Sequence, residues 1–356
     1  MLKHALLLFT ATAISMLFGT MRMEAQSAML NLPDSSQAAR VAQRIGITDI
    51  TIDYHRPLVR GRKIFGGLEP YGKVWRAGAN VNTTISFSDP VIINGQALAQ
   101  GKYGLHMIPG ETSWVVIFSK NSAAWGSFTY NPAEDALRIT VKPETIANQE
   151  ALKYDFDDLD ANSAILSMLW EKVAVRFKVE VKTAEIVEKS LRSQLQGRIQ
   201  FEWQPWEEAA NYLLDNKLSA QEAEQDAERS VELEDRFENE MTKVRALTAL
   251  GRGDEAQTAK NKAIAIGSQS QIHDFGRRLQ REGRQADAFD LFTGNIKKDP
   301  NTWMAHNEAA RIAVSKSDFA TAIKEMKLAA DASPGPLKTQ HNDLIRQLEN
   351  KVDINK

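Results

Sequence analysis

The sequence contains no cysteine among its 356 residues. This absence excludes disulfide bonds, thiolate nucleophiles, cysteine-based zinc sites and iron–sulfur clusters. An excess of charge of one sign is also lacking, because 44 lysines and arginines balance 46 aspartates and glutamates to a net charge of −2. A chain so balanced has no overall field that attracts nucleic acid or an anionic membrane surface. We therefore expect no nucleic-acid partner.

Histidine is scarce, with six residues, and no two of them show the spacing of metal ligands. We expect no metal site and no cofactor. Nucleophile motifs such as G-x-S-x-G are absent, and the glycines between Gly61 and Gly67 do not belong to a Walker loop. A pair of carboxylates for glycoside hydrolysis stays open as an alternative, because their geometry is set in three dimensions.

Long apolar runs are lacking except near the start of the sequence. Lys3 and His4 precede an apolar run of fourteen residues, Ala5 to Phe18, and Ala25 supplies a small residue before Gln26. This pattern predicts a signal peptide over residues 1–25 and an exported protein, either periplasmic or secreted. An uncleaved N-terminal anchor is the alternative. No later stretch is apolar enough to cross a bilayer, so we expect no membrane span after signal cleavage.

Residues 46–182 show the short alternating patterns of β-strands, separated by turn signals about every ten residues. The clearest hairpin signal is Asn94-Gly95, between two apolar runs. The segment from Trp114 to Phe118 is nearly continuous in apolar residues, as in an internal strand. Nine or ten strands without an intervening helix predict an all-β antiparallel sandwich or jelly-roll-like domain. Residues 26–45 show only a weak helical stripe and are placed outside this domain.

Residues 205–352 are helical and repetitive. Four alanines recur at spacings of 33, 32 and 34 residues, and a leucine, glycine or serine lies five residues before each one: Ala223, Ala256, Ala288 and Ala322. This region resembles divergent tetratricopeptide repeats, whose helix–turn–helix unit has a period of 34 residues. Residues 183–204 are predicted to form a helical linker. A last amphipathic helix, from Leu337 to Val352, is predicted to cap the array.

The β region resembles a known family, the exported bacterial domain of unknown function numbered 2911, over about residues 45–182. The motifs that carry this resemblance are Arg56-Pro57, Gly61-Arg62, Phe65-Gly66, Pro70-Tyr71-Gly72, Trp75-Arg76, Gly78-Ala79-Asn80, Gly101-Lys102-Tyr103, Ile108-Pro109, Trp114, Trp125-Gly126 and Trp170-Glu171. The resemblance implies a fold family and an exported location. It implies no activity and no catalytic residue.

Residues 54–80 form the strongest candidate for a site, because arginines and aromatic residues alternate there among glycines and prolines. Guanidinium groups bind carboxylate or phosphate, and aromatic faces bind sugars or other flat groups. This composition suits a small anionic ligand or a glycan. The predicted ligand-binding residues are Arg62, Tyr71, Trp75, Arg76 and Asn80. The alternative is that this loop only caps one end of the sandwich.

The leading hypothesis from the sequence is an exported, non-enzymatic binding protein. Its helical repeats would dock a protein partner, the ordinary use of such arrays, and its β domain would bind a ligand or partner through residues 54–80. The alternative is an envelope hydrolase that acts on glycans or another anionic substrate at the same loop, with Glu69 or Glu171 as the acid. In a third hypothesis the β domain is only a structural platform for the repeats.

Overall fold

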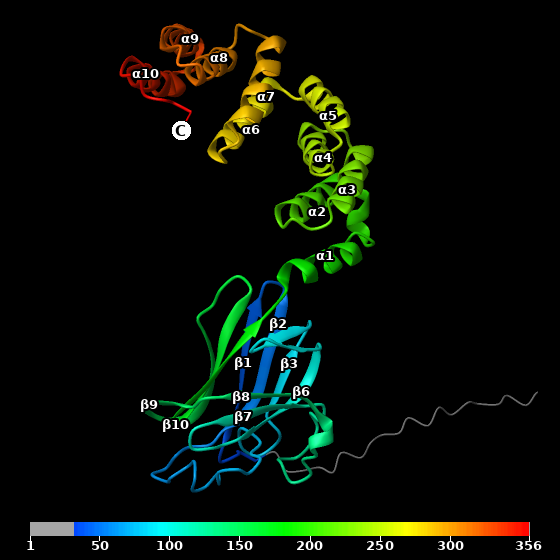
Figure 1. Ribbon diagram of the computed structural model, residues 1–356, viewed down its shortest axis with the longest axis vertical. Coiled ribbons are helices and arrows are strands. Elements are labelled where there is room, and N and C mark those ends of the chain that lie inside the picture. Colours follow the sequence, from blue (N-terminus) through cyan, green and yellow to red (C-terminus); the bar gives the residue numbers. More distant parts are fainter. Residues whose placement is uncertain (1–31, 356) are drawn as a thin grey trace, which may run out of the picture.

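The computed structural model describes residues 32–355. The signal peptide predicted for residues 1–25 lies outside the described residues. Strands form a compact body, and an arc of helices extends from it through helix α1 (Figure 1). Within residues 32–355, no helix combines the length and apolar character needed to cross a membrane.

The β body consists of two antiparallel sheets that face each other across one hydrophobic core. The first sheet has the order β1-β2-β3-β6-β7-β8. Its strands are β1 (Gln37–Ile45), β2 (Thr48–Arg56), β3 (Thr84–Phe87), β6 (Gly101–Ile108), β7 (Trp114–Ser119) and β8 (Asp135–Val141). Strand β7 is internal, as its continuous apolar sequence predicts, and the sandwich predicted from the strand pattern is confirmed.

The second sheet has the order β5-β4-β10-β9. Its strands are β4 (Val91–Ile93), β5 (Gln96–Leu98), β9 (Glu144–Asp157) and β10 (Ser163–Glu180). The predicted Asn-Gly hairpin joins β4 to β5, and both turn residues adopt positive φ, 46° at Asn94 and 80° at Gly95. These are the angles that a two-residue hairpin turn requires.

Strand β10 is one strand of 18 residues, although its alternating pattern is broken in the middle. A register shift at Glu171, whose φ is 55°, interrupts the alternation within one strand of 18 residues. The extra residues of this shift lie on β9, where Lys153 and Gln149 oppose Leu169 and Glu171. Across the shift, the alternating buried side chains of β10 change from even positions such as Trp170 to odd positions such as Val175. A single strand therefore reads as two separate alternating runs.

The weak helical stripe of residues 26–45 is a wrong prediction over residues 37–45, which form β1 (Gln37–Ile45), and its first residues, 26–31, lie outside the described residues. All nine residues of β1 pair with β2, and Gly46, at φ 57°, turns the chain between them. Only every second side chain of β1 is partly buried, and one of these is Gln43. Because Gln43 is polar and yet faces inward, the alternation of apolar and polar residues that marks a strand is not visible in this sequence. Pairing with β2 therefore decides the conformation of β1.

The helical part begins with α1 (Thr183–Gln194), the predicted linker helix, and a short 3₁₀ turn. Four helix pairs follow: α2 (Trp203–Asp215) with α3 (Ala220–Leu233), α4 (Phe237–Ala249) with α5 (Gly253–Ile266), α6 (Gln269–Arg281) with α7 (Gln285–Lys298), and α8 (Trp303–Ser315) with α9 (Phe319–Ala332). The first helices of the pairs start at intervals of 34, 32 and 34 residues. This spacing confirms the tetratricopeptide-like architecture.

The four repeated alanines are buried near the start of the second helix of each pair, where a small side chain lets the two helices approach. Gly276 on α6 has the same role, since a Cβ there would lie 2.3 Å from the ring of Phe292 on α7. Helix α10 (Gly335–Glu349) packs on α9 through Ile345 and Leu348 and caps the array. Val352, the last residue of the helix predicted from the sequence, instead lies beyond the end of α10 and is exposed.

Candidate functional site

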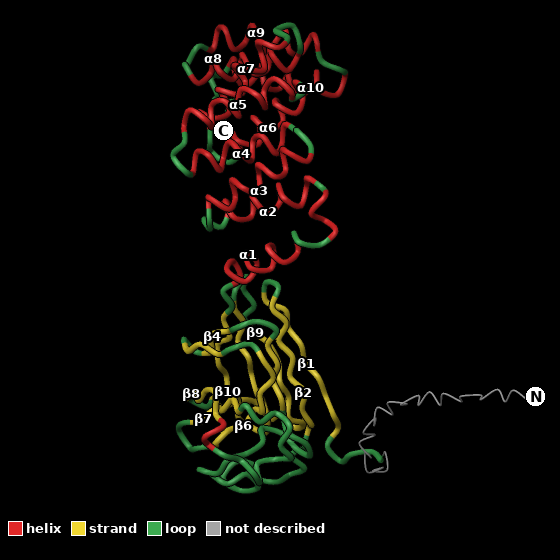
Figure 2. The backbone as a smooth tube through the Cα atoms, turned by 90° about the vertical axis from the view of Figure 1, so that its right-hand side faces the viewer, coloured by secondary structure: helices red, strands yellow, loops and turns green. Residues whose placement is uncertain are grey.

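The long connection between β2 and β3 closes the end of the sandwich that lies away from α1 (Figures 1 and 2). It is fastened to both sheets. Val59 donates to the Glu150 carbonyl on β9 at 2.8 Å, and Trp75 and Met107 on β6 exchange two hydrogen bonds of 2.8 Å each. Ile64 and Phe65 are buried between these two anchors. The connection is therefore an ordered part of the core, as its aromatic content suggests.

Two of the predicted ligand-binding residues lie outside the cavity that this loop forms. Trp75 is 4% exposed, stacks on Trp170 at 5.7 Å between ring centroids, and donates from Nε1 to the Gly78 carbonyl at 3.1 Å. Tyr71 is exposed and its ring covers Gly66, which leaves no space for a Cβ at that position. The contacts of Trp75 are those of a core residue.

The other three predicted residues come together around a cavity of about 310 Å³, lined by Arg62, Arg76, Asn80 and Glu69 among others. Arg62 donates from Nη2 to the Leu58 carbonyl at 2.6 Å and from Nε to the Val59 carbonyl at 3.0 Å. These bonds hold the guanidinium at the cavity wall.

Arg76 and Asn80 are joined across the same cavity. Arg76 donates from Nη1 to the Asn80 carbonyl, and Asn80 donates from Nδ2 to the Ser36 carbonyl at 3.1 Å. Asn80 itself adopts a left-handed φ of 57°, which asparagine tolerates better than most residues. The cavity thus joins the segment before β1, at Ser36, to the connection between β2 and β3.

Glu69 faces these arginines. Burial raises the pKa of Glu69 to about 7, and the positive charges of Arg76 and Arg62 act in the opposite direction. At neutral pH the carboxyl group is therefore protonated in a large fraction of molecules. The cavity then carries guanidinium groups with a neutral carboxyl group among them, a combination that favours an anion.

An exposed aromatic pair adjoins Arg76, and the sequence pattern missed half of it. Trp125 and Phe128 are 67% and 77% exposed and stack at 6.0 Å between ring centroids. The Arg76 guanidinium lies 5.7 Å from the centre of the Phe128 ring. Gly126 allows this approach, since a Cβ there would lie 2.9 Å from Nη1 of Arg76. The order Trp-Gly-Ser-Phe has no period, so only the fold brings Phe128 to the arginine.

The second predicted acid, Glu171, does not line this cavity. Its Oε1 accepts a 3.5 Å hydrogen bond from the Ile64 amide, so its side chain steadies the loop. His106, on β6, is 2% exposed and its Nδ1 lies 3.1 Å from Ser127 Oγ. Burial lowers the pKa of His106 to about 4, which keeps it neutral near pH 7. No cluster of three or more metal-ligating side chains occurs within residues 32–355.

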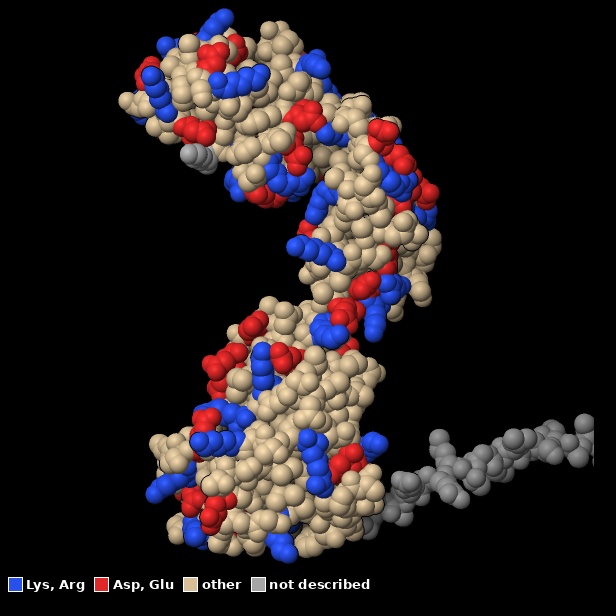
Figure 3. All heavy atoms as spheres, in the orientation of Figure 1, with Lys and Arg blue, Asp and Glu red and all other residues tan. Residues whose placement is uncertain are grey.

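A second candidate site lies on the inner side of the helical arc. Two adjoining hollows of about 490 and 420 Å³ share Arg245, Phe275, Leu279 and Arg284. We call this surface the α2–α6 groove, because these residues and their neighbours come mainly from the first helices of three pairs. Basic side chains project from the repeats into the hollow of the arc (Figure 3).

The α2–α6 groove combines an apolar strip with held polar groups. Arg245 on α4 donates to the Asn211 and Asp215 side chains of α2, which fixes its guanidinium across two helices. Phe275 on α6 is half-buried, and the Arg278 guanidinium lies 4.3 Å from the centre of its ring. The sequence repeat predicts the inner face, but not which side chains meet on it.

Comparison with known proteins agrees with this two-part description. The model of the family described as "Protein of unknown function (DUF2911)" matches residues 36–179, which confirms the resemblance drawn from the motifs of the β region. That match begins at the start of β1, so it includes the first strand. No curated protein matches the chain.

Two solved structures are similar to part of the chain, each at 17% sequence identity. "Crystal structure of APC/C hetero-tetramer Cut9-Hcn1" has a TM-score of 0.27 and covers 42% of this chain and 28% of its own. "Crystal structure of YrrB: a TPR protein with an unusual peptide-binding site" has a TM-score of 0.26 and covers 45% and 83%. These likenesses are weak, so the repeat assignment rests on the helix lengths and spacing of this chain.

Proposed function

We propose that this chain is an exported, non-enzymatic binding protein whose helical repeats dock an extended segment of a protein partner. The α2–α6 groove is the observation that carries the proposal. It offers a half-buried aromatic side chain, Phe275, with Arg278 over its ring, and Arg245, which the neighbouring helix α2 holds in place. Aromatic residues and arginine dominate the binding energy of protein interfaces.

The groove suits a peptide better than a small molecule. Its two hollows are open and adjoin each other along three successive helix pairs, from Leu214 on α2 to Leu291 on α7. Its charges are mixed, with Arg245 and Arg284 near Asp215 and Asp287. A partner segment with apolar side chains for Phe275 and charged groups of both signs matches this surface.

Capture experiments with a matched pair of variants test this proposal. The mature chain, residues 26–356, is cross-linked to proteins of the exported fraction, and the captured species are identified by mass spectrometry. We expect Phe275→Ala to reduce capture of a specific protein by about tenfold or more, as for a central interface residue. Phe201→Ala is the control, because Phe201 is 71% exposed and lies outside the groove. Equal capture by both variants contradicts the proposal.

The export part of the proposal rests on residues 1–25. A reporter enzyme that is active only outside the cytoplasm is fused after residue 30, and its activity is compared with a fusion lacking residues 1–25. We expect activity only with the leader present, because an apolar run of this length directs export. Activity of the leaderless fusion, or none with the leader, contradicts the proposal.

A second function is favoured by the cavity at Arg62 and Arg76. Three arginines, Arg60, Arg62 and Arg76, and the carboxyl group of Glu69 line a cavity of about 310 Å³, the size of a small ligand. Because positive groups outnumber the single, partly protonated carboxyl group, the ligand is a small anion such as a carboxylate or phosphate. Glu69 is the one acidic residue lining this cavity in the described part of the chain, whereas glycoside hydrolysis uses a pair. The cavity therefore supports binding.

A further inference from the structure

The segment that follows α10 turns back onto the inner side of the last repeats. Lys351 adopts a φ of 56°, and the Val352 amide donates to the Gln347 carbonyl at 2.9 Å, which closes the helix and reverses the chain. Beyond this turn, Ile354 is 5% exposed and Asn355 is 6% exposed.

Asn355 is bound in the manner of a recognised ligand. Its Oδ1 accepts from Gln280 Nε2 on α6 at 2.9 Å, and its carbonyl accepts from Gln285 Nε2 on α7 at 2.9 Å. Its Nδ2 donates to the Arg311 carbonyl on α8 at 3.0 Å. Helices α6 and α8 thus bind the two ends of one carboxamide, and α7 binds the main chain beside it. A side chain without both an acceptor and a donor at this position cannot make the two side-chain bonds.

Ile354 supplies the apolar half of the same contact. Its side chain packs in a cluster with Val314 of α8 and Leu348 of α10. Its carbonyl accepts from Nη1 of Arg311. The docked segment therefore combines one aliphatic side chain, one main-chain acceptor and one carboxamide, which is the usual composition of an extended peptide in a groove.

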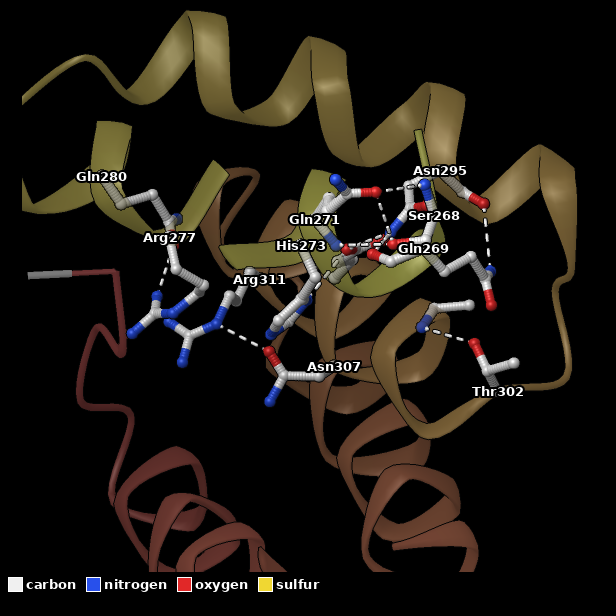
Figure 4. A network of polar contacts seen from close by, with 12 residues as sticks. Ser268, Gln269, Gln271, His273, Arg277, Gln280, Asn295, Thr302, Asn307 and Arg311 are labelled. Atoms are coloured by element: carbon white, nitrogen blue, oxygen red, sulfur yellow. Dashed lines mark hydrogen bonds and ion pairs between the residues drawn. The ribbon is translucent and has the colours of Figure 1, made fainter. Parts of the chain in front are cut away.

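Two arginines, Arg277 and Arg311, lie beneath this segment (Figure 4). Arg311 is 3% exposed and donates from Nε to Asn307 Oδ1 at 2.8 Å, and no ion pair of Arg277 or Arg311 occurs within residues 32–355. Figure 4 shows the two guanidinium groups side by side, with the dark red chain of the last segment passing near them. Burial lowers the pKa of Arg311 to about 9, Arg277 acts in the same direction, and Asp353 opposes it.

A buried guanidinium without a counter-ion is costly unless acceptors surround it. The Ile354 carbonyl supplies one of those acceptors, so this surface is complete only when an extended segment lies on it. Capping of the array does not require this contact, because α10 already covers α9 through Ile345 and Leu348. The surface has the properties of a binding site that is filled from within the chain.

We propose that the inner surface formed by Gln280, Gln285, Asn307 and Arg311 is a second protein-binding site, which residues 353–355 occupy in cis. Its partner is an extended protein segment with an aliphatic residue followed by asparagine, the pair that Ile354 and Asn355 present. The site is distinct from the α2–α6 groove. A partner binds by displacing the cis segment, so access to the site is regulated by its release.

The test uses a fluorescent peptide with the sequence of residues 347–356 as the probe. It is titrated into the full chain and into a variant that ends after Val352, and binding is followed by anisotropy. We expect saturable binding to the truncated variant and binding at least about tenfold weaker to the full chain, because the cis segment competes at high effective concentration. No saturable binding to the folded truncated variant overturns the proposal, as does equal binding to both chains.

A matched pair of substitutions locates the site. In the truncated variant, Gln280→Ala is expected to weaken peptide binding by about tenfold, since it removes the donor to the asparagine carboxamide. Gln269→Ala is the control on the same helix, where Gln269 bonds the carbonyls of Asn295 and Asp299 instead. If the truncated variant does not fold, Asn355→Ala in the full chain replaces it. Peptide binding by that variant no tighter than by the unmodified chain refutes the proposal.

Discussion

Replacement of Glu308 by glutamine probes the charge state of a polar cluster inside the repeats, which also contains His273 and Asn295. The Glu308 side chain on α8 is fully buried. Its Oε1 lies 2.9 Å from His273 Nδ1 and accepts from Asn295 Nδ2 at 2.8 Å. Its Oε2 has no hydrogen-bond partner within residues 32–355. A charged carboxylate in these surroundings is poorly stabilised.

The contact between Glu308 and His273 therefore joins two neutral groups. Burial raises the pKa of Glu308 to about 8, against the opposing hydrogen bond from Asn295. Burial also lowers the pKa of His273 to about 4. At pH 7 the carboxyl group holds its proton and the imidazole lacks a second one, so this is a hydrogen bond without an ion pair. Glutamine reproduces the neutral form.

The sign of the pH dependence follows from these values. Because the pKa of Glu308 is above its ordinary value of 4.5 in the folded chain, its stabilisation is complete below pH 4.5 and is lost as pH rises through 8. Between pH 6 and 7.5 the wild-type chain then loses about 2 kcal/mol at 1.36 kcal/mol per unit, an upper limit. His273, with a lowered pKa, gains stability with pH over this range in both chains. The difference in pH-dependent stability between the wild type and Glu308→Gln therefore reports the titration of Glu308.

Hydrogen exchange of the α8 amides measures this local stability, because the repeats can open independently of the β domain. We expect the opening free energy of the wild type to fall by about 1–2 kcal/mol relative to Glu308→Gln between pH 6 and 7.5. Glu349→Gln, an exposed change at the end of α10, is expected to follow the wild type. Parallel pH profiles for wild type and Glu308→Gln would refute the assignment of a buried, protonated carboxyl group.

Two further predictions concern packing and the cavity. Gly276→Ala is expected to lower the free energy of unfolding of the repeats by about 1–3 kcal/mol, because the new Cβ would overlap the Phe292 ring. Urea unfolding measures it, and Gly335→Ala, with nothing within 4 Å of its added Cβ, is expected to be neutral; equal effects would contradict the packing argument. Arg76→Ala is expected to weaken binding of inorganic phosphate or succinate at least about tenfold in calorimetry, since it removes a cavity guanidinium. Arg44→Ala, an exposed arginine paired with a carboxylate on the same sheet, should bind like the wild type, and unchanged binding by Arg76→Ala would remove the cavity as an anion site.

The sequence reveals the candidate site of the β domain only in part. The 54–80 loop stands out by composition, and three of its five predicted residues, Arg62, Arg76 and Asn80, line one cavity. Glu69 joins them there, whereas Trp75 is enclosed in the core. Composition identifies a loop rich in binding chemistry, but burial decides which of its side chains face a cavity.

The regular elements whose information is local follow from the sequence alone. The Asn94-Gly95 hairpin forms because both turn residues readily adopt positive φ. The helix pairs form because an alanine at one position of each repeat lets the two helices approach. Each of these depends on residues within about 34 positions of one another, so periodicity and turn chemistry are sufficient to predict them.

Only the tertiary structure decided the features whose partners are remote along the chain. Strand β1 exists because β2 pairs with it, and β10 is one strand because a bulge at Glu171 keeps both halves on β9 and β4. The docking of Asn355 on Gln280 joins residues 75 positions apart. Local preference in such segments is weak, and long-range pairing and burial outweigh it, so the sequence determined the order of the two domains while the fold determined which side chains meet.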